Sequence, residues 1–261
     1  MSNLSTGYGR AFFELEDSEL SGSAPVLVAL ALELCKPRSV VDVGCGTGRL
    51  LTEFQTAGVS EVLGIEGPWV DPSTLHLAKE QVKILDLTRP FSLGRRFDLA
   101  VCLEVGEHLP PKSARSLVSS LVQHSDLILF SAAIPFQGGR QHVNEQWPQY
   151  WARLFAECDY LPIDAIRPRV WSDDRVAYCY RQNLLVYVRR SEIARFPALE
   201  SAPRLATGSS PLPLVHPDRH LETYTTWRGL TYSLMLGLLH LTGLRRSAAI
   251  ETDSSDQNAE K

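Results

Sequence analysis

The chain has 261 residues, of which 44% are hydrophobic and 21% are charged, a balance that excludes a disordered or fibrous protein. A net charge of −4, with no block of Lys and Arg, argues against a nucleic-acid partner. Five cysteines without C-x-x-C spacing and an N-terminus without a secretory signal lead us to expect reduced thiols and a cytoplasmic location.

Short apolar runs alternate with helical patterns over much of the chain. After a helical run that breaks at Pro37, we expect buried strands in "VVDV", "EVLGIEG", "VKILDL", "RFDLAVCLEV" and "DLILFSAAIP". Helices are expected after the first strand and in "KSARSLVSSLVQHS" and "EQWPQYWARLFAECDY". The segment "RVAYCYRQNLLVYVRR" is expected to form a long late strand. The alternation predicts an α/β fold, a parallel sheet with helices on both faces.

The composition changes after residue 195, where Pro and Ser become frequent. The run from Gly229 to Leu244 has 16 formally uncharged residues, fewer than the roughly 20 that a membrane span needs. The segment 227–246 is therefore interpreted either as packing against the protein itself or as a peripheral membrane contact. We expect an N-terminal arm over 1–20, a central domain over 21–195, an irregular and apolar helical extension over 196–250, and a disordered polar tail over 251–261.

The first segment that indicates chemistry is "VDVGCGTG", where an expected strand ends at Val43 and an expected helix begins near Arg49. Its glycines permit positive φ angles and a close approach of the backbone to a ligand, and the helix start offers free N–H groups. The spacing is G-x-G-x-G after Asp42, whereas an NAD-binding Rossmann domain uses G-x-G-x-x-G. This pattern resembles the first motif of the class I S-adenosylmethionine (AdoMet)-dependent methyltransferases.

Acidic residues at the ends of later strands extend the resemblance over residues 36–190. Glu66 ends the second strand, where a carboxylate accepts hydrogen bonds from a ribose diol, and Asp86 ends the third, where the family places an acid on the adenine amino group. The resemblance implies a Rossmann-like, seven-stranded, mostly parallel sheet with AdoMet as cofactor. The cofactor-binding residues that it implies are Asp42, Gly44, Cys45, Gly46, Gly48, Glu66, Asp86, Leu87, Leu103 and Glu104.

The segment "LEVGEHLPP" follows the fourth expected strand, at the edge of the sheet where the family transfers its methyl group. In a helical conformation Glu104, Glu107 and His108 share one face, which indicates a metal site or an acid–base site. The segment is similar to ubiquinone-type O-methyltransferases and to small-RNA terminal 2′-O-methyltransferases, in which the matching residues are implicated in divalent-metal binding. The RNA enzymes add a later His, matched here by His142 in "GGRQHVNEQW". The resemblance thus implies a site for Mg, Mn or Zn at these four residues.

Two metal-free interpretations stay open. In the first, His108 or His142 takes the proton of the acceptor hydroxyl as a general base, and Glu107 orients the imidazole. In the second, Glu104 binds the cofactor or the backbone, and His108 caps the following loop.

Candidate substrate contacts lie in the loop and in the late strand. Asn144 follows His142, and Gln182 and Asn183 interrupt an apolar strand pattern, where a hairpin turn is the alternative explanation. Trp147 and Trp151 are interpreted as core anchors of the next helix rather than as a platform for a sugar.

The expected function is AdoMet-dependent O-methylation of a small oxygen-rich acceptor: a sugar, a glycoside or a secondary metabolite. The phrases "HVNEQWP" and "YRQNLLVYV" resemble bacterial methyltransferases found beside glycosyltransferase and cell-surface or secondary-metabolite genes, which favours a sugar or glycoside hydroxyl as acceptor. A peripheral membrane contact through 227–246 would instead suit a lipid-linked acceptor. Three alternatives stay open: a metal-dependent RNA 2′-O-methyltransferase, an NAD-dependent oxidoreductase and a non-catalytic AdoMet-binding module.

Overall fold

The structure is a computed structural model, and it describes residues 10–200, 202, 214–216, 231 and 234. The chain divides into two units, Met1–His216 and Pro217–Lys261. The expected boundary at 195/196 thus lies inside the first unit, and almost all of the expected extension and tail lies outside the described residues, as does most of the segment 227–246. Among the described residues, no helix is both long enough and apolar enough to cross a membrane.

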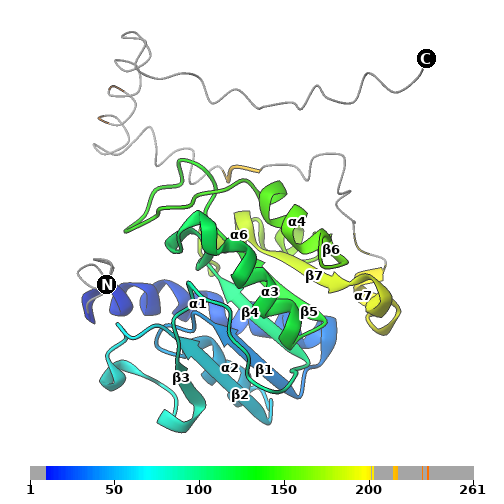
Figure 1. Ribbon diagram of the computed structural model, residues 1–261, viewed down its shortest axis with the longest axis horizontal. Coiled ribbons are helices and arrows are strands. Elements are labelled where there is room, and N and C mark those ends of the chain that lie inside the picture. Colours follow the sequence, from blue (N-terminus) through cyan, green and yellow to red (C-terminus); the bar gives the residue numbers. More distant parts are fainter. Residues whose placement is uncertain (1–9, 201, 203–213, 217–230, 232–233, 235–261) are drawn as a thin grey trace. The chain divides into compact units, whose positions relative to one another are not determined.

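Seven strands form one sheet in the order β3-β2-β1-β4-β5-β7-β6 (Figure 1). All neighbouring pairs are parallel except those of β7, which runs antiparallel to both β5 and β6. The expectation of a Rossmann-like, mostly parallel sheet of seven strands is confirmed. The strands are β1 (Ser39–Val43), β2 (Glu61–Glu66), β3 (Val82–Ile84), β4 (Leu99–Leu103), β5 (Leu127–Ser131), β6 (Tyr160–Ile163) and β7 (Leu185–Arg189).

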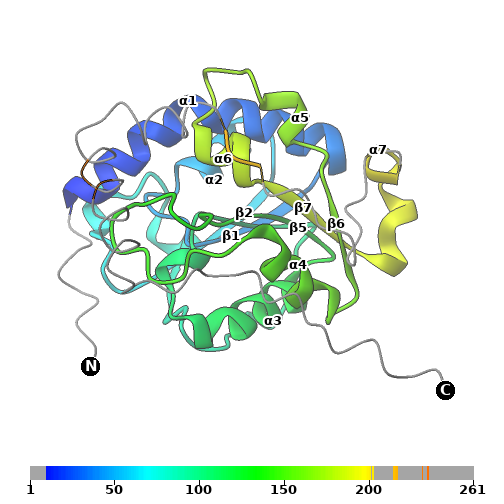
Figure 2. The same ribbon diagram turned by 90° about the horizontal axis from the view of Figure 1, so that it is seen from above.

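Helices cover both faces of the sheet, as the alternating pattern predicts. Figure 2 shows α1, α2, α5 and α6 over one face and α3 and α4 over the other. The helices are α1 (Arg10–Cys35), α2 (Arg49–Thr56), α3 (Ala114–His124), α4 (Pro148–Ala156), α5 (Arg167–Val170), α6 (Tyr178–Asn183) and α7 (Pro197–Glu200). Short 3₁₀ turns are η2 (Pro72–Thr74), η3 (Lys79–Gln81), η4 (Gly106–His108), η5 (Pro111–Ser113) and η6 (Arg190–Arg195).

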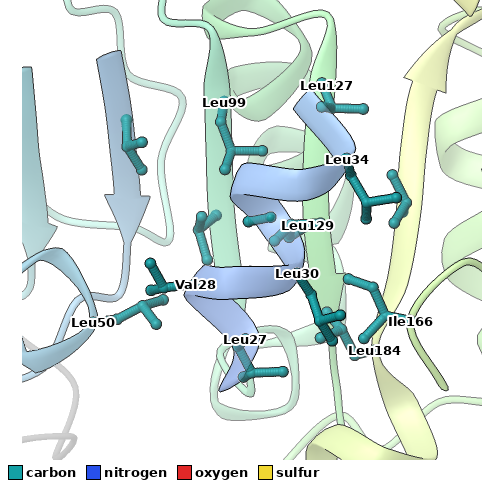
Figure 3. Close-up of a cluster of buried hydrophobic side chains, with 14 of the residues drawn as sticks. Leu27, Val28, Leu30, Leu34, Leu50, Leu99, Leu127, Leu129, Ile166 and Leu184 are labelled. Atoms are coloured by element: carbon teal, nitrogen blue, oxygen red, sulfur yellow. The ribbon is translucent and has the colours of Figure 1, made fainter. Parts of the chain in front are cut away.

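Each face of the sheet has its own hydrophobic core. On the α1 face, Leu27, Val28 and Leu34 pack against strand residues such as Leu99 and Leu129 (Figure 3). On the opposite face, α3 and α4 contribute aliphatic and aromatic side chains to a second cluster. Burying one such side chain contributes about 1.5–3 kcal/mol, so these two clusters hold the helices on the sheet.

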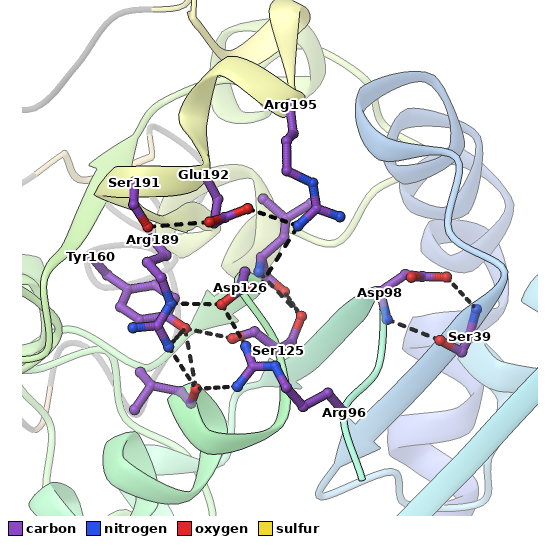
Figure 4. A network of polar contacts seen from close by, with 12 residues as sticks. Ser39, Arg96, Asp98, Ser125, Asp126, Tyr160, Arg189, Ser191, Glu192 and Arg195 are labelled. Carbon is purple, nitrogen blue, oxygen red and sulfur yellow. Dashed lines mark hydrogen bonds and ion pairs between the residues drawn. The ribbon is translucent and has the colours of Figure 1, made fainter.

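A charged network closes the edge of the sheet at which the parallel strands begin. Asp126, just before β5, accepts a hydrogen bond from Arg189 Nε at 2.6 Å and another from Arg96 (Figure 4). The Tyr160 hydroxyl donates to the Ser125 carbonyl at 2.6 Å. Every formal charge in this cluster faces an opposite one, so we assign this edge to stability.

The helix α1 begins much earlier than the sequence predicts. Residues 10–20 belong to it, so the expected arm over 1–20 is wrong for this part. The stretch around residue 22 contains Gly, Ser and Pro, which is typical of a helix boundary. Tertiary packing nevertheless keeps this stretch helical. A Cβ on Gly22 would lie 2.7 Å from the Arg175 carbonyl oxygen, and Ser23 Oγ accepts the Ala177 N–H at 2.9 Å. The small residues therefore allow α1 to contact the chain before α6.

The expected long late strand is also wrong in its first half. Tyr178–Asn183 forms the helix α6, and the strand β7 begins only at Leu185. Local hydrogen bonds are sufficient for this turn of helix, because the Arg181 and Leu184 N–H groups donate to the Ala177 and Tyr180 carbonyls at 3.2 Å. The strand β6, which follows α4, was not expected from the sequence. Trp151 is buried as expected, but Trp147 is 39% exposed and is not a core anchor.

Gly64 in β2 gives a direct test of the packing between the sheet and the turn that follows β1. A Cβ at this position would lie 2.6 Å from Cys45 Sγ and 3.4 Å from Leu51 Cδ1. We expect Gly64→Ala to lower the free energy of unfolding by about 1–3 kcal/mol in urea titrations, because the core has no room for the methyl group. Adding Cys45→Ala removes the sulfur and should recover part of this loss; a double variant no more stable than Gly64→Ala would contradict the explanation.

Candidate functional site

A cavity lies at the edge of the sheet where the parallel strands end. The order of strands reverses between β1 and β4, and α/β folds bind ligands at such a switch point. Four carboxylates line the cavity, but no Lys or Arg does so among the described residues. The lining residues are Phe13, Asp17, Leu20, Asp42, Gly44, Cys45, Gly46, Thr47, Leu50, Glu66, Trp69, Leu87, Thr88, Leu103, Glu104, Val105, His108, Leu109 and Tyr180.

The Gly-rich turn forms the floor of this cavity. Gly46 has a φ of +55°, and a Cβ there would meet no atom closer than Phe13 Cδ1 at 4.0 Å. A side chain at this position would thus extend into the cavity itself. Gly44, with a φ of +82°, packs so closely on Val105 that a Cβ would lie 2.3 Å from a methyl carbon. Gly48 does not line the cavity and instead precedes α2.

Two buried carboxylates stand behind the turn. Glu66 accepts the Gly46 N–H at 2.8 Å and the Gly67 N–H at 2.7 Å, which joins the end of β2 to the turn. Asp42 is 4% exposed and accepts no hydrogen bond from any residue that the structure describes. Burial, and then the charge of Glu66, raise the pKa of Asp42 to about 8. Burial likewise raises the pKa of Glu66, although hydrogen bonds from Gly67, Gly46 and Trp69 oppose this.

The N-terminal part of α1 covers the cavity, and the sequence did not predict this role. Asp17 accepts hydrogen bonds from Thr47 Oγ1 at 2.7 Å and from Arg49 Nε at 2.7 Å, and its carboxylate lies 2.9 Å from His76 Nε2. Burial would raise the pKa of Asp17, but its hydrogen bonds with Arg49, Thr47 and His76 lower it to about 2. The hydrogen bonds from Thr47 and Arg49 to Asp17 therefore hold α1 against the Gly-rich turn. The only sequence signal for Asp17 is the mixture of acidic and aromatic residues in "RAFFELEDSEL".

The acid expected at the adenine does not reach the cavity. Asp86 has a side chain that is 52% exposed, accepts hydrogen bonds from the Thr88 N–H and Oγ1, and forms an ion pair with Arg89 at 3.5 Å. Its neighbours Leu87 and Thr88 line the cavity instead, as does Leu103 at the end of β4. Thr88 was not predicted from the sequence.

The residues after β4 do not form the α-helical turn that would place their side chains on one face. Glu104 has a φ of +53°, and only residues 106–108 form a short 3₁₀ turn, η4. Glu104 accepts hydrogen bonds from Gln137 and Asn183, whereas Glu107 Oε1 accepts the Ala133 N–H at 3.1 Å. Burial, and then the charge of Glu104, raise the pKa of Glu107 well above its usual range.

The loop after β5 brings His142 to His108, as the sequence predicts. Their rings meet edge to face with centroids 4.9 Å apart. The loop is held by its backbone, because Val143 and Asn144 both donate N–H hydrogen bonds to the Glu107 carbonyl, at 2.8 and 3.0 Å. Together Glu107, His108 and His142 offer ligand atoms that lie within 4.8 Å of one another, a set to which Glu104 does not belong. Glu107 Oε2 is buried without a hydrogen-bond donor, so the donor set fits a divalent metal.

Glu145, and not Glu107, orients His142. The Glu145 carboxylate lies 3.0 Å from His142 Nδ1 and accepts N–H hydrogen bonds from Phe136 and Gly138, each at 2.7 Å. Burial would raise the pKa of Glu145, but these three hydrogen bonds keep it below its usual value. Because an ionised carboxylate only accepts, Nδ1 of His142 is the donor in this contact, and Nε2 is the ring nitrogen that Glu145 does not engage.

The three candidate substrate contacts are all buried and hydrogen-bonded within the protein. Asn144 donates to the Gly106 carbonyl at 3.2 Å and accepts from Gln146, so it supports η4. Gln182 and Asn183 in α6 are 1% and 4% exposed, and their amides contact Gln137 and Glu104. None of the three lines the cavity.

Residues 20–170, more than half of the chain, match a family model described as a methyltransferase domain. The chain therefore belongs to this methyltransferase family. The resemblance to class I AdoMet-dependent methyltransferases is confirmed, and the match does not favour the NAD-dependent oxidoreductase. No curated protein is significantly similar to the chain in sequence.

Solved structures share the fold at low sequence identity. The sugar N-methyltransferase KedS8 from Streptoalloteichus sp ATCC 53650 is 17% identical, with a TM-score of 0.52 over 69% of this chain and 92% of that one. The O-methyltransferase NcsB1 from neocarzinostatin biosynthesis is 15% identical, with a TM-score of 0.50 over 68% of this chain and 56% of that one. DesVI from Streptomyces venezuelae is 21% identical, but its TM-score of 0.39, over 49% of this chain and 58% of that one, is too low to show a shared fold.

The burial of His108 makes stability depend on pH. Burial, and then the charge of His142, lower the pKa of His108 to about 4, against about 6.5 in an unfolded chain. Between these values the unfolded state binds the extra proton, so stability contributed by neutral His108 is lost as the pH falls from about 6.5 to about 4. Urea unfolding over this range should show a loss of about 3 kcal/mol in the wild type that is largely missing in His108→Gln. Equal slopes for the two proteins would contradict a buried neutral imidazole.

Proposed function

We propose that this chain transfers the methyl group of AdoMet to a hydroxyl group of a small oxygen-rich acceptor: a sugar, a glycoside or a secondary metabolite. The observation that carries the proposal is the pairing of His142 with Glu145 next to His108, a residue that lines the cavity. Bound AdoMet supplies an electrophilic methyl group on a positively charged sulfonium.

The cavity fits such a cation by its charge and its shape. Asp42 is a buried carboxylate without a partner among the described residues, and it lies in a lining that lacks Lys and Arg. Gly46 leaves open the space into which a side chain would otherwise extend. We therefore place the cofactor against Asp42, Gly44, Cys45, Gly46, Glu66, Leu87, Leu103 and Glu104, and add Asp17, Thr47, Trp69 and Thr88.

His142 is the general base in this proposal. Its Nδ1 proton is held by Glu145, so Nε2 accepts the hydroxyl proton as the oxygen attacks the methyl group. His108 is neutral at pH 7 and remains a polar contact for the acceptor. Trp147, exposed at the start of α4, is available as a platform for a sugar ring.

A divalent metal is a second candidate at the same place. Glu107, His108 and His142 would hold it, and Glu107 Oε2 is the atom that lacks any other partner. A bound Mg, Mn or Zn would act as a Lewis acid that lowers the pKa of an acceptor hydroxyl.

The remaining parts of the proposal concern partners and location. A cavity lined by acids favours an uncharged small acceptor over RNA, whose phosphates would be repelled. We place the enzyme in the cytoplasm, with a peripheral membrane contact through residues 227–246 if the acceptor is lipid-linked.

Gly46→Arg tests the cofactor site. The arginine side chain would fill the cavity, so S-adenosylhomocysteine should no longer raise the thermal unfolding midpoint or bind in calorimetry. The matched control is Gly94→Arg, at another glycine of positive φ with no atom within 4 Å of its Cβ and away from the cavity. At about 100 times its Kd, the ligand should stabilise the wild type and the control by about 2.7 kcal/mol. Normal binding by Gly46→Arg would overturn the AdoMet assignment.

His142→Ala, with and without metals, separates the two catalytic roles. As a base, His142 should contribute roughly 10²–10⁴ to kcat for methyl transfer to a panel of sugars, glycosides and aromatic diols. Affinity for S-adenosylhomocysteine should stay unchanged, because His142 does not line the cofactor cavity. If Mg, Mn or Zn further stabilises the wild type bound to S-adenosylhomocysteine but not Glu107→Gln, the metal role replaces the base role. Methyl transfer unaffected in His142→Ala would exclude both.

A further inference from the structure

A chain of buried amide side chains connects Glu104 with the backbone at His216. Asn183 Nδ2 donates to both Glu104 carboxylate oxygens, at 3.1 and 3.3 Å, and Gln137 Nε2 donates to Oε2 at 3.1 Å. Gln182 Nε2 donates to Gln137 Oε1 at 3.1 Å and to Asn183 Oδ1 at 3.0 Å. At the far end, the His216 N–H donates to Gln182 Oε1 at 2.7 Å. Asn183 and Gln137 thus contact the Glu104 carboxylate directly. Gln182 and the His216 N–H contact it only through these two amides.

The direction of these hydrogen bonds is set by two backbone donors. An amide side chain keeps its shape when its oxygen and nitrogen exchange places, so its partners decide its orientation. A backbone N–H can only donate. The His216 N–H therefore fixes Gln182 with its oxygen outward and its NH₂ group toward Gln137 and Asn183. The Ile134 N–H, at 3.2 Å, fixes the oxygen of Gln137 in the same way.

The consequence is that the amide side chains present N–H groups, and no amide oxygen, to Glu104. Once Gln182 donates to Asn183 Oδ1, the NH₂ group of Asn183 must point at Glu104. If Gln182 were reversed, Asn183 would tend to reverse with it, and an amide oxygen would then face the carboxylate. Two amide groups then donate to this carboxylate, since Asn183 contacts both of its oxygens and Gln137 contacts Oε2, and together they fix its orientation.

We infer that Gln182 and His216 are positioning residues, and that the His216 N–H sets the polarity of the amide chain so that amide N–H groups orient the Glu104 carboxylate at the cofactor cavity. This inference rests on the proposed function, because Glu104 matters in this way only if the cavity binds AdoMet. The segment Leu214–His216, remote in sequence from every expected motif, thereby takes part in cofactor binding. Its histidine ring packs on Trp171 with centroids 4.6 Å apart, and Nε2 lies 2.7 Å from the Trp171 carbonyl oxygen.

The ring contacts and the N–H contact can be separated by substitution. His216→Ala removes the ring but keeps the N–H, whereas His216→Pro removes both. We expect His216→Ala to bind S-adenosylhomocysteine within about threefold of the wild type, and His216→Pro to bind at least about tenfold more weakly, the loss expected when a charged partner is misoriented. Equal affinities for the two variants would overturn the inference.

A double-mutant cycle on the affinity for S-adenosylhomocysteine distinguishes the proposed coupling between His216 and Gln182 from a purely structural role of either residue. Gln182→Met interrupts the amide chain, so adding His216→Pro to it should cost no further affinity, whereas independent effects would multiply. If His216→Pro does not fold, Gln182→Glu replaces it, since a carboxylate cannot donate to Gln137 and Asn183 and should weaken binding more than Gln182→Met does. Equal losses for these two would also overturn the inference. A wild type that does not bind S-adenosylhomocysteine would instead contradict the proposed function.

Discussion

The rest of this structure depends on the burial of three carboxylates at one edge of its sheet. Glu66 is compensated by two backbone N–H groups, whereas Glu107 accepts one N–H and its burial raises its pKa. Asp42 has no such compensation among the described residues. A buried charge without a partner is costly, and the free protein lessens the cost by holding protons. A cationic ligand in the cavity would lower that cost, so the burial of these carboxylates favours a positively charged cofactor.

The single reversed strand explains how distant residues reach this edge. Because β7 runs antiparallel to β5, its first residue, Leu185, pairs with Phe130 near the end of β5. The residues just before β7 therefore lie at the edge of the sheet where the parallel strands end. Gln182 and Asn183 lie there in α6, beside Glu104 at the end of β4. Had α6 continued β7 as one strand, these amides would have been carried away from Glu104.

The sequence predicts the elements that local patterns specify and misses those that tertiary contacts decide. Five strands and the Gly-rich turn follow from apolar periodicity and residue spacing within short stretches, whereas the family resemblance implied the approach of His142 to His108. The helix α1 continues through Gly22, which meets the backbone of Arg175, a contact 153 positions away in sequence that no local pattern reveals. The pairing of Glu145 with His142 was open to prediction, since both residues lie in one loop, but the choice between Glu145 and Glu107 required the fold.

Acidic side chains have different partners at the two ends of the sheet. Where the strands begin, the Asp126 carboxylate is surrounded by the guanidinium groups of Arg96, Arg189 and Arg195. Where they end, Arg49 is the only guanidinium among the described residues that forms an ion pair with a lining acid, Asp17. Asp42 and Glu104 face the cavity with no cation of the described chain beside them, and the amide chain from His216 satisfies Glu104 without neutralising it. Uncharged donors hold a carboxylate in place without pairing it with a cation of the protein. A binding site for a cationic ligand requires this arrangement, whereas a purely structural contact does not.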